Sequence, residues 1–344
     1  MTVLRRWQKE PGARLQGSRS LDRWKVQAPC VVRVPTGGYR LFYTAVGPAK
    51  PYLSCQGYIL SAFSDDGLEF RTEPGIRLAP QPALPHMSLR VLVPSVTRGV
   101  DAGWRMYFES RGSARRPTAI CSAVSDDMLH WEPEEGIRFE GFGGVGGPRI
   151  LVLPDGQSRL YCFASEFSQD TPHKRVRQGV VSAVSSDGLN FELESGYRMR
   201  DKQEKYDSAG ITAAQVIPPQ AAGADWTMFY SAWQDVPAGT VVPLHPSHDP
   251  DAETSGLSEN FARASIASDM AGYRSRIFLA YSSDGLTWER AGCVIEGSGH
   301  ESDDLDAVHA EDMSLIEIGV GKYRMYYAAC DSSGQWGIAS AVTA

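Results

Sequence analysis

A seven-residue pattern, Ser-x-Asp-Gly-Leu-x-aromatic, constrains the fold of this chain more than any other feature of the sequence. It occurs at residues 64–70, 125–131, 185–191 and 282–288, with Met in place of Gly in the second copy. The Asp residues of successive copies are 61, 60 and 97 residues apart. Regular spacing of this size indicates a repeat protein in which each repeat is one supersecondary unit. The longer last interval predicts an insertion of about 37 residues in the fourth unit.

The segments that flank the pattern also repeat. An alternating apolar strand occurs five times, at residues 40–43, 105–108, 159–162, 227–230 and 324–327. A turn and a short outer strand follow the pattern at residues 73–78, 134–139 and 194–199. The first unit therefore predicts four antiparallel strands, at residues 28–34, 40–45, 57–64 and 70–78. A four-stranded sheet that recurs about every sixty residues is typical of a propeller blade.

The two ends of the chain complement each other. The fifth unit ends within its third strand, at residues 340–344, while residues 7–15 match residues 70–78 in register. We therefore predict an all-β, five-bladed β-propeller, with four antiparallel strands per blade and an N-terminal strand that closes the last blade. It forms a single domain over residues 1–344, and the predicted blades span residues 25–79, 86–140, 146–200, 206–296 with an insertion at 234–274, and 306–344 together with 1–15.

Charge and composition limit the classes of partner. A net charge of −7 opposes general binding to nucleic acid or to anionic membranes, which require a basic face. Because no apolar run approaches a membrane span and residues 1–20 lack the core of a secretory signal, we expect a soluble, cytoplasmic protein. The six cysteines lack CxxC spacing, which favours buried thiols over disulfides or a metal site.

Repetition separates architecture from chemistry. The Asp of the pattern suits a tight turn between the third and fourth strands, and its presence in four blades favours a structural role. A residue that breaks the repeat in one blade is less easily explained by the fold. At the fifth position of the second strand, Glu109 is the only acid among Thr44, Phe163, Ser231 and Ala328, and it is a candidate catalytic residue.

Further acids lie at the predicted starts of the inner strands, beside the propeller axis. The aligned segments are Gln27-Ala28-Pro29, Leu92-Val93-Pro94, Gly146-Gly147-Pro148, Asp207-Ser208-Ala209 and Glu311-Asp312-Met313. Acids occur only in the fourth and fifth of these. Asp207, Glu311 and Asp312 are therefore candidate catalytic residues. His309, Glu311 and Asp312 together are an alternative site for a divalent metal near the axis, although no cofactor is predicted as a requirement.

Other residues are candidates for binding a substrate. Arg90 and Arg149 could hold a carboxylate or a phosphate, with a structural ion pair as the alternative. Glu166, just past a second-strand end, and the aromatic Trp233 are added to the substrate-binding set, as is His309. The insertion carries His245-Pro-Ser-His248 followed by two acids; a Pro-rich loop rarely preorganises a metal cluster, so a lid or a contact arm is favoured.

Taken together, the five units, the repeated hairpin pattern, the Arg-Met-Tyr-Tyr second strand and the Glu-Asp-Met-Ser-Leu inner strand resemble the five-bladed propeller glycosidases of glycoside hydrolase families 43, 32 and 130. The resemblance spans the whole chain and implies a small carbohydrate or glycoside as the partner. It also implies carboxylates around an axial pocket that act as general acid and as base or nucleophile. Families 43 and 32 place an Asp in the first inner strand, where this chain has Gln27-Ala28-Pro29. Family 32 places Arg-Asp-Pro where this chain has Gly146-Gly147-Pro148.

This departure leaves three hypotheses. The first is a glycoside hydrolase with relocated acids, drawn from Asp207, Asp312, Glu311 and Glu109. The second is a different enzyme on the same scaffold, either a phosphorylase with phosphate at Arg90 or Arg149, or a metal-dependent tailoring enzyme. The third is a noncatalytic glycan-binding propeller whose aromatic side chains stack on sugar rings. The hydrolase is favoured.

Overall fold

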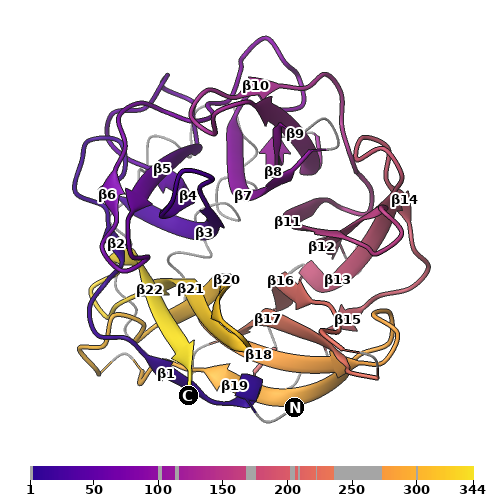
Figure 1. The fold of residues 1–344 in the computed structure, drawn as a ribbon. Coiled ribbons are helices and arrows are strands. Elements are labelled where there is room, and N and C mark those ends of the chain that lie inside the picture. The colour runs from indigo at the N-terminus through magenta and orange to yellow at the C-terminus, as the bar shows by residue number, and fades with distance from the viewer. Residues whose placement is uncertain are drawn as a thin grey trace.

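The computed structural model describes residues 3–99, 103–112, 116–167, 176–201, 206–207, 210–221, 223–235, 273–299 and 301–344. Five antiparallel sheets stand in a ring around a central axis (Figure 1). Each sheet has four strand positions, and the outermost position is split into two short strands in the third and fifth blades. The predicted all-β, five-bladed propeller is therefore confirmed.

The strands follow one another outward from the axis in chain order, except that the outermost strands of the fifth blade come from the N-terminal segment. The first blade contains β3 (Lys25–Arg33), β4 (Tyr39–Val46), β5 (Tyr58–Ser64) and β6 (Arg71–Thr72), and the second contains β7 (Arg90–Arg98), β8 (Trp104–Arg111), β9 (Ala119–Ser125) and β10 (Glu132–Pro133). The third contains β11 (Val145–Val152), β12 (Ser158–Phe167), β13 (Val176–Ser185), β14 (Glu192–Leu193) and β15 (Met199–Arg200). The fourth contains β16 (Gly210–Ile217), β17 (Trp226–Asp235), β18 (Tyr273–Ser282) and β19 (Glu289–Ile295), and the fifth contains β20 (His309–Gly319), β21 (Lys322–Cys330) and β22 (Trp336–Thr343).

The N-terminal segment completes the fifth blade. After a 3-10 turn, η1 (Val3–Arg5), the strands β1 (Trp7–Lys9) and β2 (Leu15–Gln16) both pair with β22. Trp7 lies opposite Thr343, and the labelled chain ends lie near each other in Figure 1. The predicted closing strand is confirmed, and it removes the open sheet edge that an unclosed array would expose.

A three-residue polar cluster supports the outer half of four blades. In the first blade, Arg40 forms an ion pair with Glu73 at 2.8 Å, and Ser61 donates a hydrogen bond to the same carboxylate at 2.6 Å. The same arrangement recurs with Arg105, Ser122 and Glu134, with Arg159, Ser182 and Glu194, and with Arg324, Ser340 and Glu10. In the fourth blade Thr227 and Leu279 take the places of Arg and Ser, so the cluster is replaced as a unit. This coordinated exchange leaves no single buried charge behind.

The repeated Asp of the hairpin pattern closes a turn, as its recurrence predicted. Asp66 Oδ1 accepts hydrogen bonds from the backbone amides of Leu68 at 2.8 Å and Glu69 at 3.1 Å, and from the Ser64 hydroxyl at 2.9 Å. These amide donors lower the pKa of Asp66 to about 2. Asp127, Asp187 and Asp284 accept the corresponding bonds in their own blades.

The second copy of the pattern departs from Gly for a packing reason. In three blade contacts a tyrosine hydroxyl donates to the carbonyl of the Gly in the next hairpin, as Tyr326 does to Gly67 at 2.7 Å. A Cβ at Gly67 would lie 2.7 Å from that hydroxyl. Where the pattern carries Met128, the residue in the tyrosine position is Phe42, and the two pack in one core cluster. Without the hydroxyl, Met128 fits, although its φ of 62° lies in the left-handed region.

No helix in the described part of the chain is long and apolar enough to cross a membrane. All six cysteines are free thiols; five are buried, as expected, and Cys293 is exposed.

Candidate active site

All five inner strands carry a β-bulge at the same level of the axis. The ladder with the second strand shifts by one residue at each bulge, and a residue with positive φ lies at its centre. These residues are Ala28 (52°), Val93 (51°), Gly147 (60°), Ala213 (41°) and Asp312 (51°). Bulges of this kind are frequent beside active sites because they redirect side chains. Asp312 is the only member of this ring of bulges with an ionisable side chain.

The bulges fix the alignment of the blades. The residue before each left-handed position pairs directly with the fifth residue of the second strand, as Gln27 does with Thr44 and Glu311 with Ala328. In the fourth blade the corresponding residue is Thr212, which pairs with Ser231. The prediction that Asp207 occupies this place is therefore wrong. The first three blades mark the bulge with a following Pro, whereas the fourth has Ala213-Ala214, so the sequence does not reveal the register there.

Asp207 instead belongs to a second set of equivalent positions. It lies three residues before the first paired residue of its inner strand, as Asp22 does in the first blade and Asp306 in the fifth. All three carboxylates are buried, and each binds a cation: Arg290 at 2.6 Å from Asp207, Arg19 at 2.9 Å from Asp22 and Lys9 at 2.7 Å from Asp306. A repeated, ion-paired acid indicates a structural role.

A tyrosine accompanies these acids. The hydroxyl of Tyr43 donates to Asp22 at 3.0 Å, and that of Tyr327 donates to Asp306 at 2.8 Å. Burial, followed by the charge of Asp22, raises the pKa of Tyr43. Tyr230 holds the same strand position in the fourth blade, whereas the second and third blades have Phe108 and Cys162 there and no Asp before the strand. The matched occurrence of Asp and Tyr was readable in the sequence, and it favours a structural role for Asp207.

Glu109 reaches the axis from the second blade. Its side chain is 6% exposed, and its Oε1 accepts a hydrogen bond from Arg90 Nη2 at 2.8 Å in a buried ion pair. Its Oε2 lies where a Cβ on Gly146 of the third blade would be, so a side chain at residue 146 and the Glu109 carboxylate exclude each other. The Gly146-Gly147 segment of the third inner strand has no acidic side chain, and the Glu109 carboxylate of the second blade lies against it.

The residues equivalent to Glu109 in other blades show why its side chain points toward the neighbouring inner strand. Thr44 Oγ1 accepts a hydrogen bond from the Val93 amide at 2.8 Å, and Ser231 Oγ accepts one from the Asp312 amide at 3.0 Å. Side chains at this position therefore bind the left-handed residue of the next inner strand. Glu109 extends the same direction with a longer, charged side chain toward the third bulge.

The fifth blade contributes two neighbouring acids. Glu311 is 1% exposed, and its Oε1 accepts a short hydrogen bond from Gln27 Nε2 across the junction of the first and fifth blades. Asp312 is partly exposed and occupies the left-handed position that Asp tolerates better than most residues. Gln27, which stands where families 43 and 32 have their Asp, thus contacts an acid from the adjacent blade.

His309 does not meet these acids as a metal ligand set. Its ring stacks on Trp336 with centroids 5.2 Å apart, and its Nδ1 lies 3.0 Å from Ser275 Oγ. The Lys25 ammonium lies 5.6 Å from the centre of the same Trp336 ring. Across the residues that the structure describes, no three His, Cys, Asp or Glu side chains form a group that could hold a metal. The His245–His248 segment lies outside the described residues.

The two predicted arginines have different surroundings. Arg90 binds Glu109 and pairs across the strands with Arg111, a residue that no sequence pattern had singled out. Burial, followed by the charge of Arg90, lowers the pKa of Arg111 to about 9. Arg149 is buried and donates its hydrogen bonds to backbone carbonyls, so within the described residues its guanidinium forms no direct ion pair.

The remaining substrate-binding candidates, Glu166 and Trp233, have different surroundings. Glu166 lies near the end of the second strand β12, and it accepts hydrogen bonds from Tyr197 and from Arg200 of the outermost strand, with Arg200 Nη2 at 2.7 Å. Burial, followed by the hydrogen bond to Glu166, raises the pKa of Tyr197 to about 12. Trp233 is half-buried and pairs with Gly210, so it lies near the start of the fourth inner strand. Both residues therefore lie near the ends of equivalent second strands, and the Glu166 carboxylate is held by residues of its own blade.

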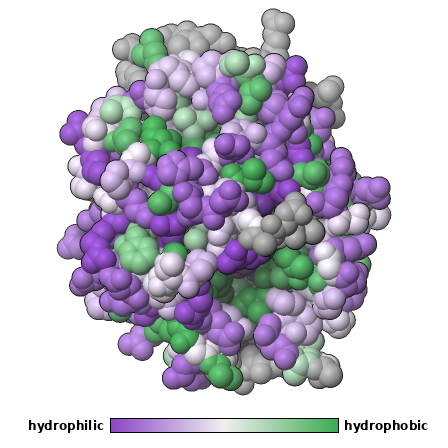
Figure 2. Space-filling model, turned by 45° about the horizontal axis from the view of Figure 1, so that its top comes forward, coloured by the Kyte–Doolittle hydropathy of each residue, from purple (hydrophilic) through white to green (hydrophobic). Residues whose placement is uncertain are grey.

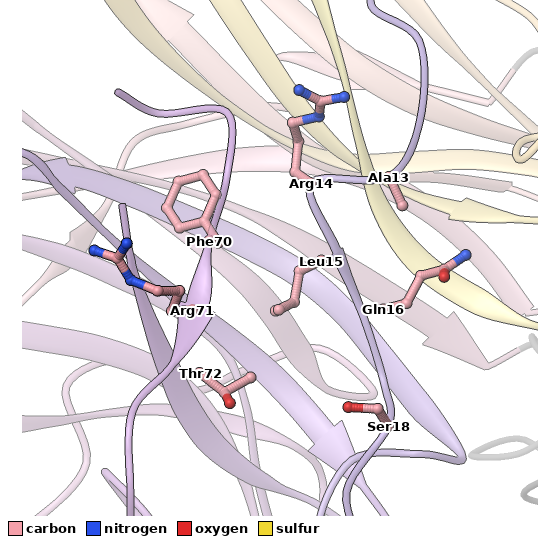
Figure 3. Close-up of a pocket in the computed structure, with 8 residues that line it drawn as sticks. All are labelled: Ala13, Arg14, Leu15, Gln16, Ser18, Phe70, Arg71 and Thr72. Carbon is pink, nitrogen blue, oxygen red and sulfur yellow. The ribbon is translucent and has the colours of Figure 1, made fainter. Parts of the chain in front are cut away.

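Two surface pockets lie away from this site. One of about 380 Å³ is bordered by the N-terminal segment from Ala13 to Ser18 and by Phe70–Thr72 of the first blade; Figure 3 shows Leu15 and Phe70 on its opposite sides. The other, of about 440 Å³, lies beside Trp104 and His130. Figure 2 shows one face of the molecule, with hydrophobic residues visible in a hollow of that face. Neither of the two pockets includes a predicted site residue.

No protein-family model and no curated protein matches this sequence. Solved structures are similar in fold. A thermostable family-43 glycoside hydrolase is 14% identical with a TM-score of 0.61, and the match covers 92% of this chain and 88% of the hydrolase chain. The β-1,2-mannobiose phosphorylase from Listeria innocua is 12% identical with a TM-score of 0.64, covering 97% and 95%. A family 117 glycoside hydrolase from Zobellia galactanivorans is 15% identical with a TM-score of 0.58, covering 98% and 90%. The chain therefore has the fold of the five-bladed propeller glycosidases that its sequence resembles.

Proposed function

We propose that the protein is a glycoside hydrolase whose axial site uses Glu109, Glu311 and Asp312. The observation that carries this proposal is that the three acids which break the repeat all lie at the ring of bulges, although they come from the second and fifth blades. Burying several carboxyl groups near one axis is costly unless they are held by partners, and such arrangements are frequent at catalytic sites.

The surroundings of the acids suggest how the work is divided. Glu109 is ion-paired with Arg90, which suits a group that acts as a carboxylate, either as base or as orienting residue. Asp312 is the most accessible of the three and suits direct contact with a sugar. In glycoside hydrolysis one carboxyl group protonates the departing oxygen while another activates water or attacks the anomeric carbon.

A phosphorylase is the second candidate, and one observation favours it. Arg90 and Arg111 are directly paired across β7 and β8, and Arg111 is close enough for its charge to interact with both Arg90 and Glu109. Arginine pairs suit the fork geometry of phosphate oxygens. In this reaction phosphate takes the place of water as the attacking group.

The experiment is a screen of aryl glycosides and oligosaccharides, with and without inorganic phosphate. The hydrolase predicts turnover without phosphate, and Asp312→Asn and Glu109→Gln each lower kcat/KM by about 10²–10⁴. Glu166→Gln, whose carboxylate is held by Tyr197 and Arg200 of its own blade, is the matched control and retains activity. Turnover only with phosphate supports the phosphorylase, and saturable sugar binding without turnover would replace both with a glycan-binding protein. Full activity in Asp312→Asn removes that residue from the mechanism.

A further inference from the structure

Arg149 occupies the axis below the acids and joins blades that are far apart in the sequence. Arg149 is buried, with 5% of its surface exposed. Nη1 donates to the carbonyl oxygens of Pro148 at 2.9 Å and Pro94 at 3.4 Å, and Nη2 donates to those of Met313 at 3.2 Å and Pro29 at 3.4 Å. One guanidinium group therefore contacts the inner strands of four blades.

The four carbonyl groups share one place in the fold. Each belongs to the residue that directly follows the left-handed residue of its inner strand. The bulge interrupts the ladder at this point, so the carbonyl oxygen is available to the axis. Converging carbonyl oxygens are the kind of ligand that proteins use for hard cations.

The charge of Arg149 also acts on the candidate site. Burial lowers the pKa of Arg149, and the charge of Asp312 acts in the opposite direction. Asp312 is therefore close enough for its carboxylate to interact with the guanidinium. The Asp312 backbone is held from both sides of its strand, by Arg149 at the Met313 carbonyl and by Ser231 at the Asp312 amide.

We propose that Arg149 is a built-in cation at the propeller axis, bound by a ring of four carbonyl oxygens, and that it is a positioning residue for Asp312. The cation role is independent of any reaction, whereas the positioning of Asp312 rests on the proposed function. A lysine or an apolar residue is unable to replace it fully, because neither presents donors in a planar fork to four acceptors.

Replacing Arg149 by Ala should leave a cavity ringed by carbonyl oxygens that accepts a free guanidinium ion. We expect Arg149→Ala to lower the urea midpoint of unfolding, and millimolar guanidinium chloride to restore most of the loss in a saturable way, because a ligand that binds only the folded state stabilises it. Sodium chloride at the same concentration should have no such effect. Arg77→Ala is the matched control, since Arg77 is also buried and donates to the Leu129 and Pro74 carbonyls but lies off the axis.

An unchanged midpoint in Arg149→Ala, or equal effects of guanidinium and sodium on it, would overturn the cation role. If Arg149→Ala does not fold, Arg149→Lys and Arg149→Met decide: the cation role requires Lys to unfold at higher urea than Met, and equal midpoints contradict it.

Activity measurements test the positioning role separately. With a substrate from the screen, guanidinium should restore kcat in Arg149→Ala, and the acidic limb of the pH profile of kcat/KM should lie at higher pH in Arg149→Met than in Arg149→Lys. Stability restored without kcat, in a protein whose wild type is active, overturns the positioning of Asp312 and leaves the cation role in place. If the wild type turns over no glycoside, the proposed function and the positioning role both fail, while the unfolding data still decide the cation role.

Discussion

The carboxylate of Glu109 occupies the space that a side chain at residue 146 of the adjacent blade would need, so only glycine fits at residue 146 while Glu109 holds this position. Gly146 has no Cβ to displace the acid, and Arg90 holds the acid from the other side. The third inner strand has no acid of its own at this point, and the carboxylate of Glu109 from the second blade fills the space beside it.

Gly146→Ala should displace the Glu109 carboxylate. We expect a loss of about 1–3 kcal/mol in unfolding free energy, as for an overpacked core, together with lower turnover. The same substitution in a Glu109→Ala background should cost less, although the Phe163 ring, 2.5 Å from where the new Cβ would lie, keeps the relief partial. A double-mutant cycle in urea measures this coupling, and strictly additive costs would show that the two residues do not compete for space.

Phe42 and Met128 should prove interdependent. Phe42→Tyr introduces a hydroxyl beside the Met128 Cβ, and Met128→Gly removes a buried side chain, so each change alone should destabilise by about 1–3 kcal/mol. The double variant recreates the Tyr and Gly pair of other blades, such as Tyr107 with Gly188. We expect it to be more stable than the sum of the single effects predicts by about 1 kcal/mol. Additivity in chemical denaturation would refute the packing explanation for Met128.

Asp207→Asn should affect stability before catalysis. The ion pair with Arg290 is 2.6 Å long and the Asp207 residue is 1% exposed, so removing the negative charge should cost about 2–3 kcal/mol. Asp22→Asn should have a similar effect because Asp22 holds the equivalent position in the first blade. The exposed Asp303→Asn is the control. A wild-type melting curve combined with lost turnover in Asp207→Asn would instead return this residue to the catalytic set.

The hairpin Asp residues predict a loss of stability at low pH. Backbone amide donors lower the pKa of Asp66 to about 2 in the folded protein, and they also lower the pKa values of Asp127, Asp187 and Asp284. Because the folded values lie below the unfolded value of about 3.9, the stabilisation is complete above pH 4 and is lost as the pH falls toward 2.

The measurement is the urea midpoint between pH 5 and about pH 2. Asp66→Asn retains a carbonyl acceptor for the turn amides but does not titrate, so its curve should be flatter than that of the wild type. The surface ion pair of Asp65 with Arg71 provides a control, Asp65→Asn, with little change in slope. Parallel curves for Asp66→Asn and wild type would contradict the assignment.

Much of the architecture follows from sequence because it depends on local spacing. The hairpin pattern marked the blades, and the match of residues 7–15 with 70–78 identified the closing strand. Glu109 was found because its strand position is read directly from the alternation of Arg105 to Phe108. The predicted register of the fourth inner strand is wrong because Ala213-Ala214 carries no turn or bulge signal. Asp207, which is followed by small residues, was aligned with the bulge in its place.

The contacts of the site depend on distances that no local pattern encodes. Arg149 looked like an anion-binding residue in the sequence, and only the closed ring shows that carbonyl groups from residues 29 to 313 meet around it. The pairing of Gln27 with Glu311 likewise joins the first and fifth blades. Arg111 was overlooked because cross-strand pairing with Arg90 is needed to recognise it.

The closing strand has a mechanical consequence. Trp7 and Thr343 face each other at one end of the β1–β22 ladder, and Lys9 and Ala341 lie further along it. A force that draws these two strand ends apart loads the ladder one residue pair at a time, in an unzipping geometry, rather than shearing all its hydrogen bonds together. The propeller should therefore yield first at its fifth blade under tension, while the other four blades, each continuous in the chain, keep their sheets.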